Sequence, residues 1–274
     1  MRDEAIQRHC AEIERCNQRG GRMLSIVDLI EAGTISRALA AYALAAIGRG
    51  GSFLVGSRPG GAGKTTVMCA LLNLVPSDVE LAPADSLAAI AEGMKSASPL
   101  PGTTTVPVVG AGHGRDARAT PRRCYICHEI GSGPYYAYLW GEELRAYFAL
   151  PRAGHILATN LHADTYEEAR AQICAENGVA ETALRRVQLM FFLSVRRGGW
   201  SATRRIEAAW ESDGSSAHRQ IFTADGAKPE LKLSGFVSVQ ELARAREAVD
   251  QIEKSGARTI QEVRAEVMRV SWRS

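Results

Sequence analysis

The chain has 274 residues, of which 46% are hydrophobic and 23% are charged, and its formal net charge is +3. This is the composition of a globular protein. The small positive excess lacks the strongly basic character of a dedicated nucleic-acid binder, so no nucleic-acid partner is expected. The longest apolar run, residues 38–47, contains six alanines and a tyrosine and is too short to cross a membrane. The first residues lack the layout of a signal peptide, which favours a cytoplasmic protein with reduced thiols.

Helical patterns dominate the first fifty residues. The spacing of apolar residues predicts a helix within residues 1–19 and a short helix over 25–32 that ends at Gly33. Thr34 is expected to cap a further helix that runs to about residue 47. We therefore predict that residues 1–50 form a helical N-terminal cover over a larger domain.

Strands and helices then alternate. Strands are predicted over residues 52–56, 79–82, 124–128, 155–159 and 190–195, and helices over 67–72, 86–95, 135–150, 166–177 and 181–189. Residues 206–210 and 218–223 flank a turn and predict an antiparallel hairpin, and residues 239–254 and 259–270 predict two closing helices. This order indicates an α/β fold, with a mainly parallel sheet covered by helices on both faces and an antiparallel edge hairpin. The predicted core is residues 51–235, followed by C-terminal helices over 236–274. Residues 96–123, rich in small and polar residues, predict a flexible insertion.

Residues 57–66, Ser-Arg-Pro-Gly-Gly-Ala-Gly-Lys-Thr-Thr, are the most informative part of the chain. They lie between a predicted strand and a predicted helix, and they match the phosphate-binding pattern G-x-x-x-x-G-K-[ST] except that Arg58 replaces the first glycine. In such a loop the backbone and the helix N-terminus surround phosphate, the lysine reaches the β- and γ-phosphates, and the hydroxyl holds Mg²⁺. The predicted ligands are a nucleoside triphosphate and Mg²⁺, and the predicted cofactor-binding residues here are Gly60, Gly61, Ala62, Gly63, Lys64, Thr65 and Thr66.

The six cysteines allow two other interpretations. Cys124, Cys127 and His128 have the spacing of a c-type haem attachment site, but haem attachment requires export and these residues also fit a buried strand. A zinc site that adds Cys10 and Cys16 has loose spacing for a structural knuckle. Buried, unreactive thiols are the favoured explanation.

Three further polar residues follow predicted strands. Asp85, Glu129 and His162 come at or after the ends of the strands over 79–82, 124–128 and 155–159. Because ligands of parallel sheets gather beyond the carboxyl ends of the strands, these side chains are expected to meet the phosphate-binding loop.

Together these segments resemble the type II/type IV secretion ATPases, a family of RecA-like ATPases that includes pilus motors and archaeal flagellar motor ATPases. Residues 58–66 resemble the Walker A loop of that family, 127–130 the end of its Walker B segment, and 83–86 its aspartate box. Residues 154–163, Gly-His-Ile-Leu-Ala-Thr-Asn-Leu-His-Ala, are similar to its histidine box, which is the most family-specific element. The resemblance covers about residues 34–225.

The chain also departs from the family pattern. Ala84 stands where the aspartate box has a glutamate, His128 replaces a glycine, Asn160 replaces a threonine, and Gly131 and Ser132 replace an arginine and an aspartate. Residues 96–123 and the spacing between Glu129 and His155 differ from the family, and no counterpart of its large N-terminal domain is expected. Residues 141–145 offer an alternative Walker B end with two glutamates, although they lie within a predicted helix, so Glu129 is preferred.

The resemblance and the chemistry of phosphoryl transfer suggest a role for each residue. Lys64 would neutralise phosphate charge, and Glu129 would position or deprotonate water or hold Mg²⁺, so that Thr65 and Glu129 are the predicted metal ligands. Asp85 would support the metal. The resemblance implies that His162 senses the γ-phosphate, whereas His155 is expected to be structural.

The resemblance implies a Mg²⁺-dependent secretion or pilus-type motor ATPase. Its expected form is a homo-oligomeric ring, hexameric in the family, that works with a membrane-protein platform at the inner face of the membrane. The departures leave open a nucleotide-binding regulatory or adaptor protein with little or no turnover. A small-molecule kinase is a weaker third possibility, because no lid rich in arginines is evident.

Overall fold

A computed structural model describes residues 2–17, 20–95, 121–133, 138–198, 201–224, 230–233 and 235–270. Most of the predicted insertion, residues 96–120, lies outside the described residues. Its last residue, Arg123, is the first residue of a strand. Within the described residues, no helix is long and apolar enough to cross a membrane.

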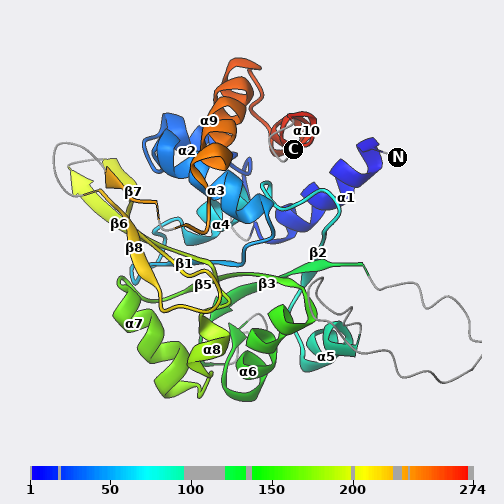
Figure 1. The fold of residues 1–274 in the computed structure, drawn as a ribbon, viewed down its shortest axis with the longest axis vertical. Coiled ribbons are helices and arrows are strands. Elements are labelled where there is room, and N and C mark those ends of the chain that lie inside the picture. The colour runs from blue at the N-terminus through cyan, green and yellow to red at the C-terminus, as the bar shows by residue number, and fades with distance from the viewer. Residues whose placement is uncertain are drawn as a thin grey trace, which may run out of the picture.

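One mixed sheet organises the chain (Figure 1). Its strands are β1 (Phe53–Gly56), β2 (Glu80–Pro83), β3 (Arg123–Ile130), β4 (Tyr138–Leu139), β5 (Ile156–Leu161), β6 (Leu189–Gly198), β7 (Ser201–Glu211), β8 (Arg219–Thr223) and β9 (Glu230–Leu231). The strand order is β2-β3-β5-β1-β6-β7-β8-β9, and β4 pairs with the end of β3. The pairs from β2 to β6 are parallel, whereas β6 to β9 are antiparallel. The predicted α/β fold with a parallel core and an antiparallel edge is therefore confirmed.

Helices cover both faces of this sheet. The helices are α1 (Arg2–Arg15), α2 (Ile26–Glu31), α3 (Arg37–Gly48), α4 (Lys64–Leu72), α5 (Leu87–Lys95), α6 (Gly141–Ala149), the 3₁₀ segment η1 (Leu150–Ala153), α7 (Tyr166–Arg170), the π-helical segment η2 (Ala171–Glu176), α8 (Glu181–Leu184), α9 (Val239–Lys254) and α10 (Ile260–Arg269). Figure 1 shows α1 to α4, α9 and α10 on one face and α5 to α8 on the other. Because side chains alternate along a strand, Phe53 and Val55 on β1 lie in the apolar core on the same face of the sheet as α1 to α4. Leu54 lies in the apolar core on the opposite face.

The same alternation decides the haem hypothesis. Cys124 lies in the core beneath α1 to α4, and Cys127 lies in the core on the opposite face of the sheet. Two thiols on opposite faces cannot attach to one haem. Burial raises the pKa of both thiols, that of Cys127 to about 12, as expected for unreactive core cysteines.

Two predicted helices are corrected by the structure. The segment predicted as one helix over residues 135–150 contains β4 and then α6, and residues 134–137 lie outside the described residues. Trp140 is extended and Gly141 has a φ of 57°, so the backbone cannot continue as a helix through this point. The helix predicted over 181–189 ends at Leu184, because Leu189 already pairs with Phe53 as the first residue of β6.

The buried C-terminal end of α4 is held by residues from both ends of the chain. Arg264 on α10 donates to the carbonyl oxygens of Asn73 at 2.8 Å and Val75 at 2.5 Å. His9 on α1 lies 3.2 Å from the Leu72 carbonyl, and burial together with the Arg264 charge lowers the pKa of His9 well below its usual value. A neutral His9 that donates from Nε2 and a cationic Arg264 therefore satisfy carbonyls that the helix itself leaves without partners.

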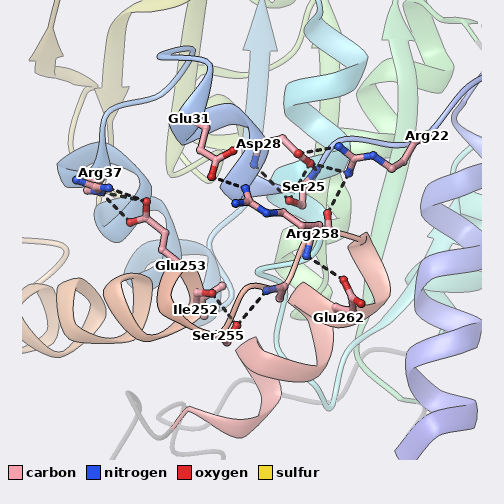
Figure 2. A network of polar contacts seen from close by, with 11 residues as sticks. Arg22, Ser25, Asp28, Glu31, Arg37, Ile252, Glu253, Ser255, Arg258 and Glu262 are labelled. Atoms are coloured by element: carbon pink, nitrogen blue, oxygen red, sulfur yellow. Dashed lines mark hydrogen bonds and ion pairs between the residues drawn. The ribbon is translucent and has the colours of Figure 1, made fainter.

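Ion pairs connect the N-terminal and C-terminal helices on the same side of the sheet (Figure 2). Arg37 on α3 binds Glu253 on α9 at 2.8 Å, and Arg258 binds Glu31 on α2. Arg22 donates to the carbonyl oxygen of Arg258 at 3.0 Å. Exposed pairs of this kind contribute little to stability, so they mainly fix how the two sets of helices align.

Glu211, at the end of β7, is a buried carboxyl group that is 1% exposed and accepts a hydrogen bond from the Tyr42 hydroxyl. Burial raises its pKa from 4.5 to about 7, although the nearby Arg219 charge opposes this rise. At pH values between these two pKa values, the Glu211 carboxyl group keeps its proton in the folded chain and loses it in the unfolded chain. Stability is therefore expected to fall as the pH rises from about 4.5 to about 7, by at most about 3 kcal/mol.

Glu211→Gln tests this expectation, because glutamine keeps the acceptor for Tyr42 but has no charge. The free energy of unfolding of the variant relative to the native protein should increase by up to about 3 kcal/mol between pH 5 and pH 8. Urea denaturation at several pH values measures this difference. A difference that stays constant with pH would show that Glu211 does not titrate in this range.

Candidate functional site

The glycine-rich loop between β1 and α4 has the backbone of a phosphate cradle. Gly61 and Gly63 have φ angles of 76° and 94°, in the left-handed region that favours glycine. Gly63 is the N-cap residue of α4 and has no side chain to accept a hydrogen bond from the helix N-terminus. The backbone N–H groups in the first turn of α4 can therefore bind an anion, which the helix dipole favours. The loop forms one wall of a cavity of about 620 Å³.

Arg58, which replaces the first glycine of the motif, fits this loop without strain. No described residue other than glycine has a positive φ, and so Arg58 lies in an ordinary backbone region. Its backbone N–H donates to Asp164 at 2.7 Å, and its guanidinium binds Glu168 on the first turn of α7 at 2.8 Å. The substitution therefore ties the start of the loop to α7 and leaves the rest of the cradle intact.

The structure brings together the three residues predicted to be catalytic. Lys64 Nζ lies 3.1 Å from Glu129 Oε1, and His162 Nε2 lies 3.1 Å from the same oxygen. Lys64 also donates to the Ser57 carbonyl at 3.1 Å and lies 3.4 Å from His162 Nδ1. Lys64 is 8% exposed, whereas the side chain of His162 is 43% exposed at the cavity surface. A carboxylate, an amine and an imidazole thus meet around the loop.

A bulge in β3 points Glu129 toward Lys64. The pairing of β3 with β5 shifts between Cys127, which lies opposite Thr159, and Ile130, which lies opposite Leu161. One extra residue on β3 is accommodated there, and such bulges re-aim side chains. The buried Asn160 on β5 donates from Nδ2 to the His128 carbonyl at 2.9 Å, which stabilises the distorted segment.

The remaining predicted residues divide into two groups. Thr65 and Thr66 line the cavity with Gly60, Gly61, Ala62, Gly63 and Lys64. Asp85 is exposed, follows the outer strand β2 and is not among the residues that line the cavity.

The three residues that are not expected to act in catalysis do not line the cavity. His155 is buried and lies 3.0 Å from the Gly93 carbonyl, and it accepts from the Arg123 N–H at 3.1 Å, as a structural histidine would. The two glutamates of the alternative Walker B segment, Glu142 and Glu143, lie in the first turn of α6 and do not line the cavity.

Sequence reasoning missed the opposite wall of the cavity. It is formed by the residues that follow α1, by α2 with the segment after it, and by the start of β7, and it contains Cys16, Asn17, Met23, Leu24, Leu29, Ala32, Thr34, Ala202, Thr203 and Arg204. The N–H of Ile206 on β7 donates to the Thr34 carbonyl at 2.9 Å, so the two parts of this wall are joined. Neither part has a motif, because its position depends on long-range strand pairing.

The residues around the cavity suit a magnesium nucleotide. The cradle and Lys64 supply positive potential for phosphates, and the Thr65 hydroxyl and the Glu129 carboxylate supply oxygen atoms of the kind Mg²⁺ prefers. Met23, Leu24 and Leu29 give the far wall apolar surface of the kind that holds a planar base. Among the described residues, no cluster of three or more histidine, cysteine or acidic residues could hold a metal by itself, and Mg²⁺ bound with phosphates needs no such cluster.

No protein-family model and no curated protein matches the chain. Among solved structures, the chain is similar to the crystal structure of the VirB11 ATPase from the Brucella suis type IV secretion system in complex with sulphate, with 18% sequence identity and a TM-score of 0.41. The similarity covers 67% of this chain and 53% of that chain, so it spans about half of the length of that ATPase.

Proposed function

We propose that the chain binds ATP with Mg²⁺ and hydrolyses the bond between its β- and γ-phosphates, as a motor ATPase of the secretion or pilus type. The observation that supports this most is the convergence of Lys64, Glu129 and His162 beside a glycine-rich cradle, at distances of 3.1–3.4 Å. A bound Mg²⁺ would supply charge neutralisation at the phosphates. Lys64 would bind the β- and γ-phosphates, and Glu129 would orient the attacking water or take its proton.

His162 is suited to report on the γ-phosphate. Its ring contacts Glu129 through one nitrogen and the Arg58 carbonyl through the other, at 3.1 Å in each case. A movement of the Glu129 carboxylate or of the start of the loop would therefore also move the imidazole ring of His162. The histidine-box resemblance further supports a ring of subunits at the cytoplasmic face of a membrane, with a membrane-protein platform as partner. Light scattering with and without MgATP would test the ring.

A second candidate is a nucleotide-binding regulator with little or no turnover. It is favoured by Ala84, which is buried where the family has an acidic residue, and by Asp85, which does not line the cavity. One acidic contribution to hydrolysis is thus missing from the site.

Phosphate release from MgATP by the native chain and by Lys64→Ala tests the proposal. Turnover should be present in the native chain and should fall to background in the variant, because the loop loses the cation that binds the β- and γ-phosphates. MgATP binding is measured in parallel by calorimetry. Binding without turnover would favour the regulator, and a native chain that binds no MgATP would contradict both candidates.

A further inference from the structure

An arginine outside every motif reaches into the phosphate cradle. Arg204 lies on β7, opposite Val195 of β6, and it borders the same cavity as the loop, Glu129 and His162. Its Nε and one Nη atom donate to the Gly61 carbonyl at 3.4 and 3.3 Å. A Cβ atom built on Gly63 would lie 3.1 Å from Arg204 Cδ, so the stem of the arginine lies directly against the loop.

The two basic side chains of the loop itself lie close to carboxylates. Lys64 lies 3.1 Å from the Glu129 carboxylate, which offsets its charge, and Arg58 is paired with Glu168. Arg204 instead donates to a neutral carbonyl. A guanidinium has five N–H donors in a planar fork, so donors remain for an anion beside the loop.

We propose that Arg204 is a phosphate-binding residue of this site, which donates from its guanidinium to the phosphate oxygens of the bound nucleotide. The inference rests on the proposed function. A planar fork with a permanent charge forms paired hydrogen bonds to phosphate. The contact with the Gly61 carbonyl holds the side chain over the cradle before the nucleotide binds. The β6–β7 hairpin thus supplies positive charge to a loop whose own arginine points toward α7.

The test is the affinity for MgATP of the native chain, Arg204→Ala, Arg204→Lys and Arg205→Ala, measured by calorimetry. Arg205 is the matched control, because it is the next residue on β7 and lines an adjoining hollow that does not include the phosphate loop. Arg204→Ala should weaken MgATP binding at least about tenfold. Arg204→Lys should recover part of that loss, because it keeps the charge but not the fork, and Arg205→Ala should bind as the native chain does.

The melting temperature without nucleotide shows whether Arg204 binds phosphate or only stabilises the loop. Unchanged melting temperatures with weakened binding would support the proposal, whereas a lower melting temperature with unchanged affinity would show that Arg204 only braces the loop. If the native chain binds MgATP, Lys64→Ala does not, and Arg204→Ala binds as the native chain does, this inference fails while the proposed function stands. A native chain that binds no MgATP overturns the proposed function itself.

Discussion

Glu129→Gln is expected to reduce phosphate release from MgATP at least about 100-fold while MgATP binding is retained. A general base or a water-positioning group typically contributes factors of about 10²–10⁴ to a rate, and glutamine cannot accept a proton at neutral pH. Binding is retained because two effects oppose each other. Glu129 Oε1 lies 3.1 Å from Lys64 Nζ, so its removal frees the lysine charge for phosphate, while Mg²⁺ loses one oxygen ligand and keeps the Thr65 hydroxyl.

Steady-state phosphate release and calorimetry measure the two effects separately. Glu143→Gln is the matched control, since Glu143 belongs to the alternative Walker B segment and lies in the first turn of α6. The control should keep both the native rate and the native affinity. If Glu143→Gln lost turnover and Glu129→Gln kept it within about threefold, the assignment of the catalytic carboxylate would be reversed.

Arg264→Leu is expected to lower the free energy of unfolding by about 3 kcal/mol or more. Arg264 is 2% exposed and donates to carbonyl oxygens of Asn73 and Val75 beyond the end of α4. Leucine would fill much of the same space but would leave these acceptors buried without their partner, which costs about 1–3 kcal/mol for each. The favourable interaction of a cation with the helix C-terminus would also be lost.

Urea denaturation, followed by circular dichroism, measures this loss. Arg269→Leu provides the control on the same helix, because Arg269 forms only an exposed ion pair with Glu266. Its effect on the free energy of unfolding should be much smaller than that of Arg264→Leu. Equal stability losses for the two variants would mean that Arg264 contributes nothing specific to the end of α4.

The sequence predicted the parts of the fold that depend on local patterns. The glycine-rich turn between an apolar strand and an apolar helix located the cradle around Gly63 and Lys64. Glu129 and His162 were located because ligands of parallel sheets gather beyond the carboxyl ends of the strands, and the structure places both residues around Lys64. The pattern of a buried strand argues against haem attachment, and the opposite faces of Cys124 and Cys127 exclude it.

Other features depend on contacts that no local pattern reveals. The bulge in β3 that aims Glu129 arises from its pairing with β5, which lies more than twenty residues further along the chain. Arg204 reaches the loop only because the β6–β7 hairpin adds an antiparallel extension beside β1. The aromatic run before α6 favoured one long helix, but the left-handed backbone of Gly141 ends that possibility.

The anchoring of α4 by both ends of the chain has a consequence for biosynthesis. The hydrogen bond from Arg264 to Asn73 joins residues that are 191 positions apart, and contacts over such distances form slowly because a long loop must close first. While the chain is being made, the helix that carries Lys64 keeps a hydrated, uncapped end until α10 has left the ribosome. The C-terminal end of the helix that carries Lys64 is therefore stabilised only late in synthesis.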